Sequence, residues 1–124
     1  MAALQALYEM DVTGHSGLKA LERVLASGAA KRADTAMARR LLEAVEANRT
    51  RLDARIAELA PSWPPEQMSV VDRNILRIAL AEMLLLESAT PPRVVVNEAV
   101  ELAKVFGSEG SRKLINGALR SMLG

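Results

Sequence analysis

Three prolines within five residues interrupt a chain whose pattern is otherwise helical. The segment Pro61-Ser62-Trp63-Pro64-Pro65 cannot continue a helix, because proline lacks the backbone amide hydrogen and restricts the residue before it. We therefore expect a connection at 61–68 between an N-terminal helical subdomain at 1–60 and a C-terminal helical subdomain at 69–124. Trp63 is expected to pack over this joint and not to serve as a platform for a ligand.

Apolar residues recur at helical spacing on both sides of this connection, and no segment shows the alternation of a strand. The stretch from Lys31 to Ala60 would form a long helix for a small domain, so we expect a break near Asn48 to Thr50. This stretch is also locally basic. A solvated helix face explains that charge better than an RNA-contacting surface does.

Cap residues mark the later helices. Thr90 and Pro91 predict a helix start, as N-cap and first-turn proline; Gly107 predicts its end, and Ser108 predicts the cap of the next helix. Helices are therefore expected near 2–11, 17–27, 31–60 in two pieces, 69–87, 91–106 and 109–122. The chain is predicted to be all-α, with about seven helices in two packed subdomains.

Composition excludes most catalytic arrangements. The chain has no cysteine and one histidine, His15, so neither a histidine triad nor a cysteine or histidine metal site can be assembled. We predict that the protein is not an enzyme and has no catalytic residues, metal or cofactor. The net charge is only +1, so binding to nucleic acid would depend on local clusters of cations. With three aromatic residues, a broad stacking platform is not expected.

No apolar run reaches the roughly 18 residues that a membrane span requires. The first residues also lack the charged and apolar regions of a signal peptide. The expectation is a cytoplasmic protein without a membrane partner.

Two helices carry unusual polar residues. In the helix at 69–87, Asp72, Arg73, Asn74 and Arg77 share a polar side, whereas Glu82 projects among apolar residues. A buried carboxylate is costly unless it is paired, so we interpret Glu82 as a structural buried acid and not as a catalyst.

The last predicted helix presents a cationic stripe. Lys113, Asn116 and Arg120 recur at i, i+3 and i+7 on its outer side, with Gly117 beside them. Such a stripe can contact phosphates, and a glycine lets another backbone approach closely.

Five fragments stand in a fixed order along nearly the whole chain. They are Gln5-Ala6-Leu7-Tyr8; Asp72-Arg73 with Ile75-Leu76-Arg77-Ile78-Ala79 and Glu82; Val94 with Asn97-Glu98-Ala99-Val100-Glu101-Leu102-Ala103-Lys104; Gly107 with Glu109; and Lys113 with Asn116-Gly117 and Leu119. Each fragment alone is a weak signal. Together, at these separations, they resemble the NusB family of transcription antitermination factors.

The resemblance implies two packed bundles of helices and a function in transcription. Members of that family pair with NusE, a ribosomal protein of the small subunit, and hold the boxA element of nascent RNA. The complex keeps RNA polymerase elongating through ribosomal RNA operons. The contacts expected from the resemblance and from the outer stripe are with RNA at Gln5, Tyr8, Arg112, Lys113, Leu114, Asn116, Gly117 and Arg120, and with the protein partner at Asp72, Arg73 and Arg77.

The sequence also departs from the family pattern. An arginine-rich segment usually precedes the first helix, and Met1-Ala2-Ala3 begins where that segment ends, so weaker intrinsic RNA affinity is expected. Gly110 stands where an acidic residue is common, and Leu114 where an aromatic residue is common.

Two alternative interpretations stay open. One is the NusB-like domain that accompanies ribosomal RNA cytosine methyltransferases; the other is a helical protein-interaction or dimerisation module without RNA binding. Some members of the family form homodimers, and such self-association would cover the RNA-binding face.

Overall fold

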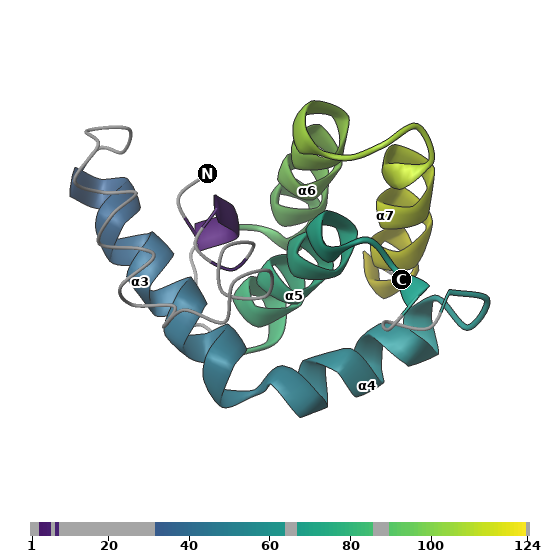
Figure 1. The fold of residues 1–124 in the computed structure, drawn as a ribbon. Helices are drawn as coiled ribbons and strands as arrows, with labels where there is room; N and C mark the ends of the chain where they lie inside the picture. Colours follow the sequence, from purple (N-terminus) through teal and green to yellow (C-terminus); the bar gives the residue numbers. More distant parts are fainter. Residues whose placement is uncertain (1–2, 6, 8–31, 64–66, 86–89, 124) are drawn as a thin grey trace.

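The computed structural model describes residues 3–5, 7, 32–63, 67–85 and 90–123 (Figure 1). Within these ranges all the secondary structure is helical, and residues 3–5 and 7 are helical as well. The all-α prediction is confirmed, and the helix count is close to the predicted seven. The helix predicted at 17–27 lies outside the described residues. The elements are α3 (Arg32–Ala47), α4 (Arg49–Leu59), α5 (Val70–Leu84), α6 (Pro92–Phe106), α7 (Ser111–Arg120) and a short 3₁₀ helix, η2 (Ser121–Leu123).

Helix α5 is the centre of the arrangement. It contacts α3 and α4 on one side and α6 and α7 on the other, as Figure 1 shows. One hydrophobic cluster joins these helices; Leu41, Ile56, Leu76, Val96 and Ile115 belong to it and are at most 1% exposed. Burial of this apolar surface is the main favourable contribution to folding. Whether the two halves of the chain form separate subdomains stays a prediction.

The predicted polar side of α5 does not face solvent. Asp72, Asn74 and Arg77 are 6%, 0% and 3% exposed, respectively. The helical period was correct, but neighbouring helices cover the polar side as well as the apolar side. Glu82 is also buried, as predicted, and it has an interaction partner.

A buried ion pair connects α4 to α5. The Arg77 guanidinium donates from Nε to Asp53 Oδ1 at 2.7 Å and from Nη2 to Asp53 Oδ2 at 2.8 Å. Its Nη1 donates to Asn74 Oδ1 at 3.1 Å. This bidentate hydrogen bonding compensates for the loss of solvation of the buried guanidinium. Within α4 itself, Glu58 pairs locally with Arg55, whereas Asp53 reaches across to α5.

The predicted break near Asn48 is confirmed. Helix α3 ends at Ala47, and Asn48 leaves helical geometry with φ −125°. The Asn48 side chain donates from Nδ2 to the Ala44 carbonyl at 2.9 Å, which occupies an acceptor near the end of α3. Asparagine side chains compete for backbone groups in this way, so the long helical stretch divides here.

Helix α6 begins one residue later than predicted. Pro91 is the N-cap in extended geometry, with φ −60° and ψ 144°, and Pro92 is the first helical residue. A residue before proline is disfavoured in helical geometry, so Pro91 cannot itself enter the helix ahead of Pro92. The end is as predicted, because α6 stops at Phe106 and Gly107 follows it.

The prediction that Ser108 caps the last helix is wrong. Helix α7 starts at Ser111, with Gly110 at the N-cap position and without a side-chain cap. Instead, the Ser108 amide donates to Ser111 Oγ at 2.8 Å, so the serine inside the helix closes the preceding turn.

Gly107 is required by close packing at this turn. A Cβ placed on Gly107 would lie 2.5 Å from Ser111 Cβ and 2.6 Å from the Ala103 carbonyl oxygen. We expect Gly107→Ala to lower the free energy of unfolding by about 1–3 kcal/mol, the range for overpacked sites. Denaturant unfolding followed by circular dichroism measures it. Gly110→Ala is the control, since a Cβ there meets no atom within 4 Å; equal losses in both variants would contradict the packing explanation.

Candidate nucleic-acid interface

A cavity of about 640 Å³ lies between the segment around Trp63, the first turn of α5 and helix α7. Leu59, Met68 and Leu114 contribute apolar wall, whereas Asp72 and Lys113 contribute charged groups. The cavity therefore joins residues from two parts of the sequence that are far apart along the chain, 59–72 and 108–118. Its volume falls within the range of roughly 300–1,000 Å³ that is usual for small-molecule sites.

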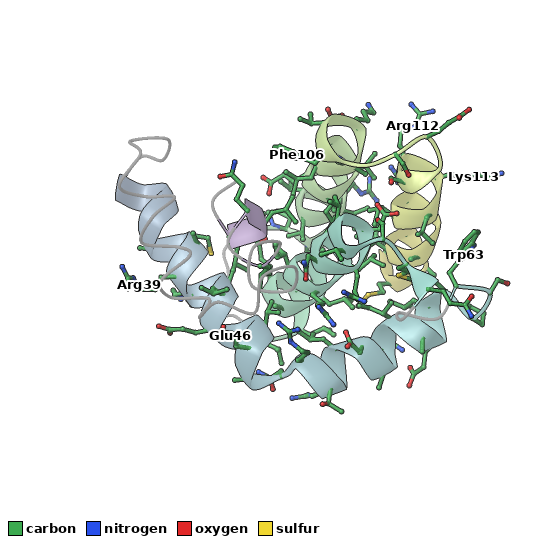
Figure 2. The ribbon with its side chains drawn as sticks, in the orientation of Figure 1. Arg39, Glu46, Trp63, Phe106, Arg112 and Lys113 are labelled. Carbon is green, nitrogen blue, oxygen red and sulfur yellow. The ribbon has the colours of Figure 1, made fainter. Side chains whose placement is uncertain are left out.

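Helix α7 places several predicted RNA-contacting residues together. Arg112, Lys113, Gly117 and Arg120 are exposed, and Lys113 and Gly117 line the cavity. Arg112 and Lys113 extend from the start of α7 into solvent (Figure 2). Exposed cations on one helix are suited to phosphate contacts, because neutralising phosphates releases the counterions that surround the nucleic acid.

The remaining predicted RNA residues are arranged less simply. Asn116 is half-buried and accepts a hydrogen bond from Arg120 Nε. This bond orients the two side chains, which lie one turn apart on α7. Leu114 is half-buried and lines the cavity. Gln5 is exposed but is not among the cavity-lining residues, and Tyr8 lies outside the described residues.

The residues predicted for the protein partner differ from one another in accessibility. Arg77 is engaged with Asp53 in the interior, and Arg73 is half-buried with an interaction partner. Asp72 is buried within the fold, but it lines the cavity. Its Oδ1 accepts no hydrogen bond. Among these three, Asp72 is the side chain that the structure places at the cavity.

Trp63 is the residue whose placement the sequence missed. It was expected to be packed over the joint, but it is 54% exposed and lines the cavity. Figure 2 shows it on the same side of the molecule as Lys113. The turn from Ala60 explains this position, because the Trp63 amide donates to the Ala60 carbonyl at 2.9 Å and the chain turns away from the core. Its proline neighbours indicated a turn but not the direction of the ring.

Gly117 lines the cavity from inside a regular helix, where glycine has no conformational advantage. A Cβ at this position meets no atom within 4 Å. We expect Gly117→Ala to raise the free energy of unfolding by about 0.5–1 kcal/mol, because alanine is the better helix former. The same methyl group would project toward the space where a ligand approaches and weaken RNA binding. Thermal unfolding and an RNA titration measure the two effects; a gain in stability with unchanged RNA affinity would show that this wall contacts no RNA.

The described residues contain no cluster of three or more His, Asp or Glu side chains that could hold a metal ion. No helix in the described ranges is long and apolar enough to cross a membrane. The described surface therefore combines an apolar cavity with a helix that bears exposed cations.

Sequence comparison identifies the family. A model of the NusB family matches residues 1–124. The chain is 43% identical over 119 residues to the transcription antitermination protein NusB of Dehalococcoides mccartyi, covering 96% of this chain and 82% of that protein. It is 44% identical over 124 residues to the protein of the same name from Chloroflexus aggregans, covering 99% and 83%. The chain belongs to the NusB family.

Solved structures agree with this assignment. The fold is similar to that of T. maritima NusB, with a TM-score of 0.87, 33% identity and coverage of 98% of this chain and 84% of that one. It is also similar to a chain in the crystal structure of antitermination factors NusB and NusE in complex with double-stranded RNA. There the TM-score is 0.85, the identity 25%, and the coverage 98% and 89%. The relatives are named as transcription antitermination proteins and not as enzymes, in agreement with the sequence prediction.

Proposed function

We propose that this protein is a transcription antitermination factor that binds boxA RNA together with NusE. In this role it supports processive transcription of ribosomal RNA operons, acting in the cytoplasm on an elongating RNA polymerase. The observation that carries the proposal is the match to the NusB family over residues 1–124. The likeness to a NusB chain that was crystallised with NusE and RNA supports the choice of partners.

The surface of α7 supports an RNA-binding role. Arg112, Lys113 and Arg120 are exposed on this helix, and the cavity beside it presents an apolar wall. Phosphate contacts by such cations give affinity that falls with salt, whereas apolar and polar cavity contacts depend on the base. We propose this face for RNA, with Gln5 and Tyr8 as further contacts, and Asp72 and Arg73 near the protein partner.

A titration of labelled boxA RNA, with and without NusE, tests the proposal. It is carried out at about 50 and 200 mM salt, with a scrambled RNA of the same length as the control. We expect tight, salt-dependent binding of boxA in the ternary mixture and weaker binding to this protein alone. Equal binding of boxA and scrambled RNA would contradict specific recognition. Absence of binding in both mixtures would instead favour a helical protein-interaction module.

Self-association is the competing state. A homodimer that covers the α7 face would reduce RNA binding as the protein concentration rises. The RNA titration is therefore repeated at several protein concentrations alongside analytical ultracentrifugation.

A further inference from the structure

The cavity beside α7 has two sides of different chemistry. One side comes from α7 and the turn before it and carries Lys113, whereas the other comes from residues 59–72. Among the described residues that line this 59–72 side there is no lysine or arginine, and the one charged side chain is the acid Asp72. A nucleotide brings an anionic phosphate with its base, and phosphates bind where cations neutralise them. The 59–72 side is therefore less suited to RNA than the side formed by α7.

Large apolar side chains give the 59–72 side its character. Met68 is 7% exposed and Leu59 is half-buried, whereas Trp63 extends toward solvent with 54% of its surface exposed (Figure 2). A tryptophan side chain can bury about 150–250 Å², so roughly half of that area still meets water here. Exposed apolar surface beside a cavity is typical of interaction sites, and tryptophan is enriched among the residues that dominate protein–protein binding.

The position of the 59–72 side favours a protein as its occupant. Asp72 lies in the first turn of α5 and lines this side, and it is the residue proposed near NusE. A surface that reaches from Asp72 to Trp63 is therefore continuous with the proposed partner contact. Ser62, Gln67 and Ser69 also line this side; they are polar but uncharged and suit the rim of a protein interface around an apolar centre.

We propose that the 59–72 side of the cavity binds an apolar side chain of NusE, with Trp63 as the anchor of the contact. The inserted side chain lies between the Trp63 ring and the wall formed by Leu59 and Met68, and it removes the exposed part of the ring from water. The α7 side stays available to RNA. This inference rests on the proposed partner and deepens it, because it names the residue and the kind of side chain that make the contact.

Trp63 allows a direct test, since it is the only tryptophan of the chain. Fluorotryptophan incorporated into this protein, and not into NusE, gives a single fluorine NMR resonance that reports on Trp63. We expect NusE to shift this resonance in a saturable manner, because the ring passes from water to an apolar contact. BoxA RNA added without NusE should leave the resonance in place.

Matched variants measure the contribution of the ring. Trp63→Ala is expected to weaken NusE binding in calorimetry about thirtyfold, the effect of a residue that dominates an interface. Trp63→Phe keeps an apolar ring and should lose less affinity. Phe106→Ala is the control, because Phe106 is an aromatic residue of similar exposure, 43%, that ends α6 and does not line the cavity. Binding of boxA RNA without NusE should be unchanged in all three variants.

Several outcomes would overturn the anchor. NusE binding that leaves the Trp63 resonance in place, or equal NusE affinity in Trp63→Ala and the unmodified protein, would reject it and leave the proposed function intact. A shift caused by boxA RNA alone would assign this side to RNA, and a shift caused by rising protein concentration alone would assign it to a second copy of the chain. Absence of NusE binding to the unmodified protein would instead reject the proposed partner itself. The fluorine measurement needs no substitution, so it decides the question even if Trp63→Ala fails to fold.

Discussion

Replacing Asp53 by alanine is expected to lower the free energy of unfolding by about 3 kcal/mol, the largest stability effect predicted for this chain. The Arg77 guanidinium, 4% exposed, would keep its charge in the interior but lose both bonds to the carboxylate. Asp53 is 30% exposed, so water replaces part of the interaction and places the loss at the low end of the range for buried pairs. The midpoint of thermal unfolding should fall by roughly 10 °C.

The measurement is denaturant unfolding followed by circular dichroism. Arg55→Ala is the control, because it breaks the exposed Arg55–Glu58 pair of the same helix, where a loss of less than about 0.5 kcal/mol is expected. The double variant Asp53→Ala with Arg77→Met should be more stable than Asp53→Ala alone, since no buried charge is left unpaired. Similar losses for Asp53→Ala and Arg55→Ala would mean that the connection between α4 and α5 contributes little.

Replacing Lys113 and Arg120 together by alanine is expected to produce the largest loss of RNA affinity. Both side chains are exposed on α7, and removal of two phosphate contacts should weaken boxA binding about tenfold at low salt. The slope of log K against log salt should become smaller by about 1.4, which is two contacts at about 0.7 each for single strands. The melting temperature should stay nearly constant, because surface substitutions rarely change stability.

The matched control removes the same charge from another face. Arg39 and Arg40 are exposed on α3, and Figure 2 shows Arg39 far from Lys113. Alanine at both positions should leave the boxA affinity, and the slope of log K against log salt, close to those of the unmodified protein. Equal losses of boxA affinity in the two double variants would indicate a general electrostatic attraction between the protein and RNA. In that case α3 would also contribute to the RNA-binding surface.

Local chemistry made the helix boundaries predictable. The break at Asn48 and the end of α6 at Gly107 follow from residues that act within one turn of the backbone. The errors at Pro91 and Ser108 were also local: two prolines in succession moved one start, and Ser111 replaced Ser108 in closing a turn. The resemblance to NusB could likewise be recognised from the order and spacing of short fragments, and the family comparison confirms it.

The candidate site was predicted in part. The outer stripe of α7 followed from the helical period, and the structure leaves Lys113 and Arg120 exposed as expected. The cavity did not follow from any local pattern, because its wall combines Trp63 and Asp72 with Gly117, which lies 45 residues beyond Asp72 in the sequence. Trp63 next to prolines indicated only a turn, and nothing in the sequence gave the direction of its ring.

The sequence by itself predicted the helical class, the break near Asn48, the end of α6 at Gly107 and the family that the chain resembles, because these depend on neighbours along the backbone. The tertiary structure alone decided that the polar side of α5 is buried and that Asp53 pairs with Arg77, 24 residues away. It also decided that Asp72 stands in the wall of a cavity. The helical period fixes which residues share a side, but only the packing of other helices determines whether that side meets water, a partner side chain or a ligand.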